Sequence, residues 1–234
     1  KVNTVWVKPS SKISFGETAA ADAKIEILEL GLTHTVFTLA GETYRTNLTG
    51  RHNVFNLSGV LLSLIDCGFS PAELRQKLLT PILVPGRLER IETPKKVHFF
   101  VDYAHTDDAL ENVLKLLRSV AAGRVIAVFG AGGNRDKTKR PRMGKVASHY
   151  ADELIITSDN PRGEEPLEII NEIVAGADKV CRIEPDREQA IKLAYQLAAP
   201  GDCVLVAGKG HETYQEVKGV RHHFSDQEII QKLV

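Results

Sequence analysis

The second half of the sequence repeats one pattern, an apolar run followed by a polar loop and a helix-like segment, and this pattern limits the possible folds more than any other feature. The apolar runs lie at residues 97–103, 124–130, 153–159, 179–183 and 203–208. Segments with helical spacing lie near residues 107–120, 139–150, 165–176 and 186–198. Buried strands that alternate with helices are typical of a parallel sheet covered on both faces. The sequence therefore predicts an α/β fold with a doubly wound, Rossmann-like domain.

The first half has strand-like runs followed by two helix-like segments. Alternating or continuous apolar residues predict strands at residues 2–7, 24–30 and 34–40. The pair Gly41-Glu42 is typical of a hairpin turn. Apolar residues at helical spacing predict a helix over 56–67, and Ser70 followed by Pro71 predicts the N-cap and first position of a second helix.

A stretch rich in proline and glycine separates the two halves. It runs from Thr80 to Pro94 and contains Pro81, Pro85 and Gly86 as well, so few regular elements are expected to cross it. We therefore place the domain boundary here, with one domain over residues 1–90 and another over residues 91–234.

Charge and cysteine content limit the cellular setting. Lys+Arg and Asp+Glu each number 30, so the net charge gives no reason to expect nucleic acid or a membrane as a partner. Cys67, Cys181 and Cys203 are odd in number and lie in apolar runs, which favours buried thiols in a reducing compartment. We therefore expect a cytoplasmic protein.

Four polar segments follow the apolar runs, and three of them contain glycine. They are DYAHT (102–106), GAGGNRDKTKRP (130–141), SDNPRG (158–163) and AGKGHET (207–213). Ligands of open α/β sheets bind beyond the carboxyl ends of the strands, where these segments are expected to lie. The sequence therefore predicts a binding site formed by loops that are distant in the chain.

The segment 130–141 is suited to an anion. Its glycines let backbone N–H groups approach a ligand, and the following basic side chains add positive charge; these are Arg135, Lys137, Lys139 and Arg140. A tight strand-to-helix turn with a solvated basic flank explains the same residues equally well. Both interpretations stay open on the residues alone.

Three further segments carry polar groups with defined chemistry. Arg162 and Asn160 are suited to binding a carboxylate, although an Asx-turn before a helix also explains this loop. Glu212 can accept hydrogen bonds from an ammonium group, whereas a structural role is favoured for His211. Asp102 ends a strand, where an acidic residue can hold a ribose hydroxyl.

The remaining histidines are not assigned to chemistry. His105 can equally cap the next turn, and His222 and His223 fit an exposed turn better than a metal site. We predict neither a metal ligand nor a catalytic residue in this chain.

Together these segments resemble the Mur ligases, ATP-dependent amino-acid ligases of peptidoglycan synthesis. GRHNVFN (50–56) and PGRLE (85–89) are similar to the end of the family's central ATPase domain, and the four loop motifs occur in family order. DNPR (159–162) resembles the branch that adds meso-diaminopimelate. The resemblance implies that residues 1–90 are the C-terminal portion of the central ATP-binding domain and that residues 91–234 are the C-terminal amino-acid-binding domain.

Two features suggest that the chain is part of a longer protein. It contains no GxxxxGK[ST] motif, and it begins with Lys1 rather than Met. We therefore expect the P-loop and the domain that holds the UDP-sugar to lie in a missing part, and we expect this chain alone to be inactive.

The resemblance also implies roles for individual residues. ATP would be contacted by Asn56 at adenine, Arg87 at the phosphates and Asp102 at the ribose. The amino-acid pocket would be lined by Arg135, Asp159, Asn160, Arg162, Gly208 and Glu212. ATP and Mg²⁺ would be held mainly by the missing part.

The implied reaction transfers a phosphoryl group from ATP to the D-glutamyl carboxylate of a UDP-N-acetylmuramoyl dipeptide, and the amine of diaminopimelate then attacks the acyl phosphate. Arg162 and Asn160 would bind the distal carboxylate of diaminopimelate, and Glu212 its ammonium. Lysine lacks this carboxylate and would leave Arg162 unpaired, at a cost of several kcal/mol.

Two alternatives remain on the sequence alone. The first is a Mur ligase that adds lysine or the D-Ala-D-Ala dipeptide; the pair Asn160 and Arg162 should be absent from a lysine pocket. The second is a non-catalytic module that binds a nucleotide or an amino acid. A P-loop upstream in the same reading frame would exclude the second alternative.

Overall fold

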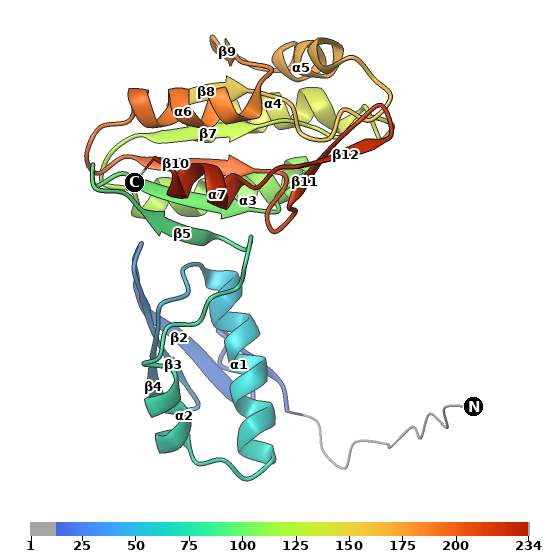
Figure 1. Cartoon of the computed structure of the whole chain (residues 1–234). Coiled ribbons are helices and arrows are strands. Elements are labelled where there is room, and N and C mark those ends of the chain that lie inside the picture. The colour runs from blue at the N-terminus through green and yellow to red at the C-terminus, as the bar shows by residue number, and fades with distance from the viewer. Residues whose placement is uncertain (1–12, 234) are drawn as a thin grey trace. The chain divides into compact units, whose positions relative to one another are not determined.

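The computed structural model describes residues 13–233, which form two compact units that divide between Ile82 and Leu83 (Figure 1). This division lies inside the stretch 80–94 and before residue 90, where the predicted first domain ends. The strand predicted at residues 2–7 lies outside the described residues. The assignment of the two halves to two family domains stays a prediction.

The smaller unit contains a four-stranded sheet and two helices. Its strands are β1 (Phe15–Gly16), β2 (Ala23–Leu30), β3 (Thr35–Leu39) and β4 (Glu42–Thr46). β2, β3 and β4 are antiparallel, and β1 pairs parallel with β2. Two helices, α1 (Arg51–Asp66) and α2 (Pro71–Lys77), pack against these strands. The core between them contains Ile25, Phe37, Leu39, Tyr44, Val54, Leu61 and Leu74.

The predicted hairpin turn is displaced by one residue. Ala40 and Gly41 both have positive φ, at 50° and 87°, while Glu42 is already the first residue of β4. Two consecutive residues with positive φ are what a type I′ hairpin turn requires, so Ala40-Gly41 is the turn rather than Gly41-Glu42.

The two helices were predicted with different success. α1 begins at Arg51, five residues before the predicted start at 56, because its polar first turn carries little apolar signal and Val54 is its first buried residue. α2 begins as predicted. The Ser70 side chain accepts a hydrogen bond from Glu73 N, and Ser70 N donates to the Glu73 carboxylate, which completes a capping box.

The larger unit contains the predicted doubly wound α/β sheet, in the order β5-β6-β10-β7-β8-β9. Its parallel strands are β6 (His98–Asp102), β7 (Val125–Phe129), β8 (Glu153–Ile156), β9 (Arg182–Ile183) and β10 (Cys203–Ala207). β5 (Glu89–Glu92) is an antiparallel edge strand next to β6. Every residue of β7 and β10 is buried, as their continuous apolar sequences require.

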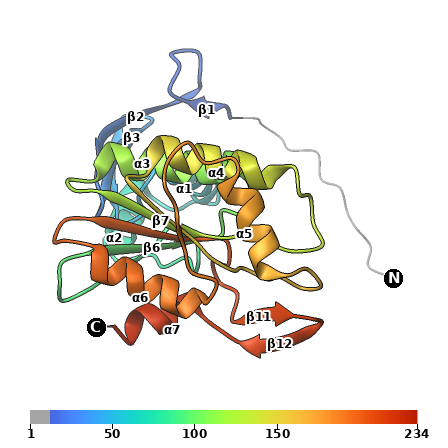
Figure 2. The same ribbon diagram turned by 90° about the horizontal axis from the view of Figure 1, so that it is seen from above.

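Helices cover both faces of this sheet. They are α3 (Asp107–Val120), α4 (Lys139–Tyr150), α5 (Pro166–Val174), α6 (Arg187–Leu197) and α7 (Asp226–Gln231). In Figure 2, α3 and α4 lie on one side of the strands, and α6 and α7 lie on the other. The first four helices match the segments predicted from apolar spacing.

Three features of the larger unit differ from the expectation. β5 crosses the stretch that was expected to be irregular, and it does so as an edge strand that ends before Pro94. β9 has only two residues, both exposed, although the run 179–183 was expected to be a buried strand. The hairpin of β11 (Tyr214–Val217) and β12 (Val220–His223), together with α7, was not predicted.

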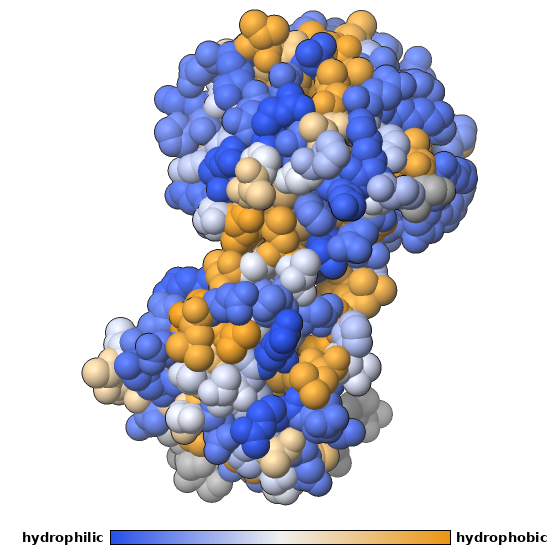
Figure 3. Space-filling model, turned by 90° about the vertical axis from the view of Figure 1, so that its left-hand side faces the viewer, coloured by the Kyte–Doolittle hydropathy of each residue, from blue (hydrophilic) through white to orange (hydrophobic). Residues whose placement is uncertain are grey.

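The surface of the larger unit is mainly hydrophilic on the face shown in Figure 3, with small groups of hydrophobic residues. Exposed apolar side chains of this unit include Leu167, Val180 and Ile183. Within residues 13–233, no helix combines the length and the apolar character needed to cross a membrane.

The cysteines differ from the expectation of buried thiols. Cys203 in β10 is buried, and burial raises the pKa of its thiol to about 11. Cys67, in contrast, is exposed, because it follows the last turn of α1, and Cys181 is partly buried. All three are free thiols.

Candidate functional site

The sheet register brings the predicted loops to one edge of the larger unit. Ala207, the last residue of β10, pairs with Asp102 of β6 on one side and with Phe129 of β7 on the other. Phe129 in turn pairs with Ile156 near the end of β8. The four polar segments therefore leave neighbouring strands at the same edge, as expected for a doubly wound sheet.

Asn160, Glu212 and Lys209 form a hydrogen-bonded cluster between two of these loops. Asn160 Nδ2 donates to Glu212 Oε2 at 2.9 Å, and Lys209 Nζ donates to Asn160 Oδ1 at 3.0 Å. Lys209 Nζ also lies 3.4 Å from Glu212 Oε2 and 3.6 Å from Asp159 Oδ1. Asn160 and Glu212 were predicted to belong to one pocket, and the structure brings them together.

Lys209 is a member of this cluster that the sequence analysis did not single out. Its side chain is fully buried, and its ammonium lies 5.6 Å from the ring centre of Tyr214 and 6.0 Å from that of Phe224. Burial lowers the pKa of Lys209, whereas the carboxylate of Asp159 opposes this shift. A lysine is ordinarily exposed, so its position in the sequence gave no signal of this role.

Arg162 is held in an unusual backbone conformation beside the glycine-rich loop. Its φ is 51°, in the left-handed region that residues other than glycine rarely adopt. Its Nη1 donates to Gly133 O at 3.0 Å, and a Cβ atom at Gly132 would lie only 2.7 Å from this nitrogen. A residue larger than glycine at position 132 would therefore displace the guanidinium.

Strand β11 fixes the loop that carries Arg162. Arg162 N donates to Glu216 O at 3.0 Å, and Glu216 N donates to Asn160 Oδ1 at 2.9 Å. The Gln215 side chain donates to Asp159 O at 2.8 Å. The unpredicted hairpin therefore supplies the hydrogen bonds that hold the predicted residues in place.

The other predicted pocket residues lie at the same edge with different exposure. Asp159 is buried, and its Oδ1 has no hydrogen-bond partner among residues 13–233. Gly208 has a positive φ of 116°, and a Cβ atom there would lie 3.5 Å from Asp159 Oδ2. Arg135 is exposed and donates to the backbone oxygen of Asn134.

The basic residues after the glycine-rich loop are partly engaged by carboxylates. Arg140 is fully buried, and its guanidinium donates to both carboxylate oxygens of Glu164 and to Glu172. Lys137 Nζ lies 2.9 Å from Glu164 Oε2. The hydrogen bonds from Arg140 hold the pKa of Glu164 well below its usual range. These contacts favour the structural interpretation of this flank.

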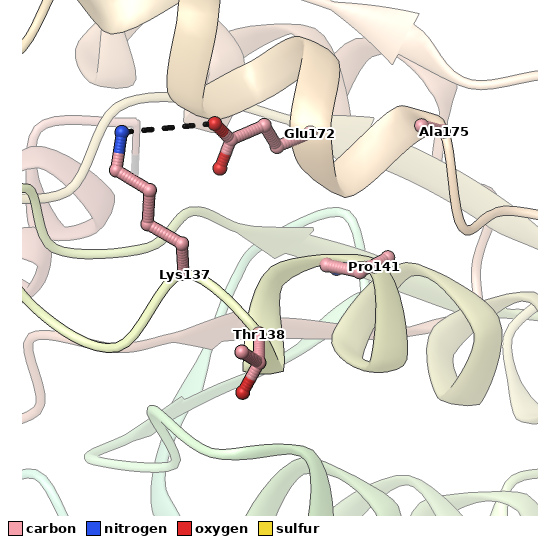
Figure 4. A pocket seen from close by; sticks show the side chains of 5 residues that line it. All are labelled: Lys137, Thr138, Pro141, Glu172 and Ala175. Carbon is pink, nitrogen blue, oxygen red and sulfur yellow. Dashed lines mark ion pairs between the residues drawn. The ribbon is translucent and has the colours of Figure 1, made fainter.

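A surface pocket lies against this ion-pair cluster. It has a volume of about 350 Å³ and is lined by Lys137, Thr138, Pro141, Glu172 and Ala175. Figure 4 shows Lys137 and Glu172 directed toward each other, with their charged atoms 3.8 Å apart. The predicted pocket residues are not among its lining, and its charged groups already pair with each other.

The residues predicted to contact a nucleotide lie in both units. Asp102 is buried and accepts hydrogen bonds from Leu88 N at 2.7 Å and Ala104 N at 2.8 Å. The Arg87 guanidinium lies 5.1 Å from the ring centre of Tyr103. Asn56 is exposed on α1 of the smaller unit. Arg87 and Asp102 therefore belong to one neighbourhood of the larger unit.

A buried ion pair lies behind the loops. Arg187 and Asp226 are both fully buried and make two hydrogen bonds of 2.8 Å. Arg187 also donates to Ala207 O at 3.0 Å, at the end of β10. The pair therefore fixes α7 to α6 and to the strand that precedes the loop of Lys209 and Glu212.

The histidines that were set aside make local contacts. His105 Nδ1 lies 2.8 Å from Tyr103 O, while Thr106 rather than His105 caps α3. His223 pairs with Glu228 at 2.8 Å. Residues 13–233 contain no group of three or more His, Cys, Asp or Glu side chains that could hold a metal ion.

Comparison with known proteins gives one family and closely similar relatives. The sequence pattern of the family described as Mur ligase, glutamate ligase domain, matches residues 86–210. A UDP-N-acetylmuramoyl-L-alanyl-D-glutamate–2,6-diaminopimelate ligase of Parabacteroides distasonis is 45% identical over 230 residues, which are 96% of this chain and 47% of that protein. The ligase of the same name from Aquifex aeolicus is 48% identical over 194 residues, which are 82% of this chain and 40% of that protein.

A solved structure of a ligase with the same name is similar over nearly the whole chain. Its TM-score is 0.72 and its identity is 37%, with 94% of this chain and 47% of that chain covered. The chain therefore spans about half the length of the relatives it matches.

Proposed function

Because the chain belongs to the Mur ligase family, we propose that it is part of an ATP-dependent ligase that joins meso-diaminopimelate to UDP-N-acetylmuramoyl-L-alanyl-D-glutamate. The names of the relatives that share 45% and 48% of the aligned residues support this proposal. The observation that carries it is the hydrogen bond between Asn160 and Glu212 at the carboxyl edge of the sheet, together with Glu216, whose backbone bonds to both Asn160 and Arg162.

The amino-acid head at the far end of diaminopimelate is the proposed ligand of this edge. Arg162 would bind its carboxylate, because a guanidinium offers several N–H donors in one plane. Glu212 and Asp159 Oδ1, which accepts no hydrogen bond within residues 13–233, would accept hydrogen bonds from its ammonium. The bond from Asn160 Nδ2 to Glu212 Oε2 orients the Glu212 carboxylate before the ligand arrives.

The nucleotide is proposed to lie beside Arg87 and Asp102. Arg87 is exposed and held over the ring of Tyr103, so its charge is available to ATP phosphates. Asp102 is fixed by two backbone donors and is proposed to hold the ribose. Asn56 is proposed to contact adenine.

In the proposed reaction, this chain binds and orients. ATP transfers its γ-phosphoryl group to the D-glutamyl carboxylate and leaves as ADP. The free amine of diaminopimelate then attacks the acyl carbon, and the amide forms as phosphate and a proton leave. Mg²⁺ would neutralise the phosphate charge when bound. Residues 13–233 do not offer a cluster for the metal ion, so its ligands are proposed to lie elsewhere in the parent protein.

The two halves are proposed to have separate roles. Residues 1–90 would be the C-terminal portion of a central ATP-binding domain, and residues 91–234 would be the amino-acid-binding domain. The parent protein would act in the cytoplasm in peptidoglycan synthesis. It is not expected to need nucleic acid or a membrane as a partner.

The test uses the full-length parent protein with ATP, Mg²⁺ and the UDP-N-acetylmuramoyl dipeptide. Meso-diaminopimelate and lysine are supplied separately with this acceptor, D-Ala-D-Ala is supplied with the corresponding UDP-N-acetylmuramoyl tripeptide, and product is detected by mass. Product with diaminopimelate at a much higher kcat/KM than with the other two is expected. Preference for lysine or for D-Ala-D-Ala would assign the protein to another branch of the family. Absence of product with all three compounds would contradict the proposal.

The chain of 234 residues provides a second test. Because it contains no P-loop, it is expected to form no product under the same conditions. Product formed by the purified chain, free of host enzyme, would contradict the expected division of roles between this chain and the missing part.

A further inference from the structure

Glu216 lies directly beside Arg162, and its backbone is fixed on both sides. Its N–H donates to Asn160 Oδ1 at 2.9 Å, and its carbonyl oxygen accepts from Arg162 N at 3.0 Å. Its side chain is only 22% exposed. The Cα atom therefore has little freedom, and the carboxylate can move only within the reach of its own side chain.

Two guanidinium groups lie at nearly equal distances from this carboxylate. Glu216 Oε2 is 3.8 Å from Arg162 Nε and 3.9 Å from Arg221 Nε. Both distances exceed the range of about 2.7–3.2 Å for N–H···O hydrogen bonds, so neither pair is tightly made. The carboxylate is therefore shared between two cations rather than committed to one.

Arg221 is placed to receive this carboxylate. It is the residue directly opposite Glu216 in the antiparallel pairing of β11 with β12. The Arg221 guanidinium lies over the ring of Tyr214, 4.3 Å from the ring centre, and the Arg221 side chain is 65% exposed. Arg221 can therefore approach Glu216 without a rearrangement of the buried part of the site.

We propose that Glu216 is a specificity-determining residue, a resident counter-ion that is shared between Arg162 and Arg221 while no ligand carboxylate is bound and moves to Arg221 when one arrives. An incoming carboxylate on Arg162 places a second negative charge beside Glu216, which repels it. Movement of Glu216 to Arg221 relieves this repulsion. This inference rests on the proposed function, because it takes Arg162 as the group that binds the distal carboxylate.

The consequence concerns discrimination against lysine. A ligand that ends in an ammonium alone leaves Glu216 beside Arg162, so Arg162 is not left without a counter-ion. Rejection of lysine is therefore weaker than Arg162 alone would provide. Glu216 therefore lowers the selectivity for diaminopimelate over lysine. Arg221 restores part of this selectivity, because it draws the Glu216 carboxylate away from Arg162.

The experiment measures kcat/KM for diaminopimelate and for lysine with the full-length parent protein and two variants, Glu216→Gln and Arg221→Gln. Glutamine nearly preserves the size of glutamate, so the backbone contacts of β11 are retained. Glu216→Gln should raise the ratio of diaminopimelate to lysine by about two- to fivefold, and Arg221→Gln should lower it by a similar factor. Calorimetric titration with diaminopimelate should give a lower Kd for Glu216→Gln, and a higher Kd for Arg221→Gln, than for wild-type protein.

Matched controls are Glu165→Gln and Arg182→Gln, which make the same charge changes at exposed positions. Both should leave the ratio unchanged. If wild-type protein uses diaminopimelate but the two test variants behave like the controls, or shift the ratio in the same direction, the inference about Glu216 is overturned alone. If wild-type protein forms no product from diaminopimelate, the proposed function fails and the inference fails with it.

Discussion

Asn160 Nδ2 donates a hydrogen bond of 2.9 Å to Glu212 Oε2, although the two residues are 52 positions apart in the sequence. The bond joins the loop after β8 to the loop after β10. Asn160 Oδ1 meanwhile accepts from Lys209 Nζ and from Glu216 N. One buried amide therefore uses both of its ends to hold three other residues.

Replacing this amide should weaken both the fold and the site. Asn160→Ala would leave Glu216 N without its acceptor and would remove the shorter of the two hydrogen bonds of the buried Lys209 ammonium, at a cost of about 1–3 kcal/mol in the free energy of unfolding. Urea unfolding followed by circular dichroism measures this cost. Asn171→Ala, on the exposed side of α5, is the matched control and should not be destabilised. Equal stability of the two variants would contradict the role of the amide.

Reversing the charge of Arg162 should change the preferred amino acid of the parent protein. In Arg162→Glu the new carboxylate would lie beside Glu216, and together they would repel the distal carboxylate of diaminopimelate while tolerating the lone ammonium of lysine. The ratio of kcat/KM for diaminopimelate to that for lysine should fall by about tenfold or more. Arg182→Glu is the exposed control. An unchanged ratio in a folded Arg162→Glu variant would mean that Arg162 does not face the distal head.

Asp102 should affect the nucleotide and not the amino acid. Asp102→Asn keeps an acceptor for one of the two backbone donors, sets its NH2 group against the other, and removes the charge that is proposed to hold the ribose. The KM for ATP should rise by about tenfold, while that for diaminopimelate should change little. Asp108→Asn, at an exposed position of α3, is the control. Intact nucleotide affinity in Asp102→Asn would remove the ribose assignment.

Acid should weaken the larger unit through Glu164. Its pKa is held well below the usual carboxyl range by hydrogen bonds from Arg140, so the folded protein keeps this carboxylate charged when the unfolded chain binds a proton. Its stabilising contribution is therefore present above about pH 4.3 and is lost progressively as the pH falls below that value. Wild-type protein should lose more unfolding free energy between pH 7 and pH 3 than Glu164→Gln does.

The control for this measurement is Glu153→Gln. Glu153 pairs with Arg182 at a longer distance, 3.5 Å, and both side chains are about one-third exposed or more. Its variant should follow the wild-type pH dependence. If Glu164→Gln did so too, the buried pair with Arg140 would not be the origin of the acid sensitivity.

The regular elements of the larger unit could be predicted because their apolar residues recur at fixed intervals. α3 and α4 have the bounds that their spacing indicates, and β7 and β10 are as buried as their apolar runs require. β11 and β12 gave no such signal, because their residues are partly buried or exposed and mostly polar. β5 was missed because the nearby prolines indicated an irregular segment.

Which residues lie together at the candidate site could be predicted better than the contacts that hold them there. Asp159, Asn160, Gly208 and Glu212 lie together because parallel strands end at one edge, and that rule needs only the strand positions. The burial of Lys209 and the hold of β11 on Arg162 depend on contacts between distant parts of the chain. Local patterns carry no information about such contacts.

The strand order has a consequence for the way in which the larger unit is made. β10, residues 203–207, lies between β6 and β7 in the middle of the sheet. While a ribosome synthesises the chain from its N-terminus, β5 and β6 therefore have no bridge to β7, β8 and β9 until β10 emerges. Asp226, the partner of the buried Arg187, emerges later still. The sheet and its ion pair can therefore be completed only after residues 203–226 have been synthesised. Nascent chains that end before these residues would expose the edges of β6 and β7 to chaperones.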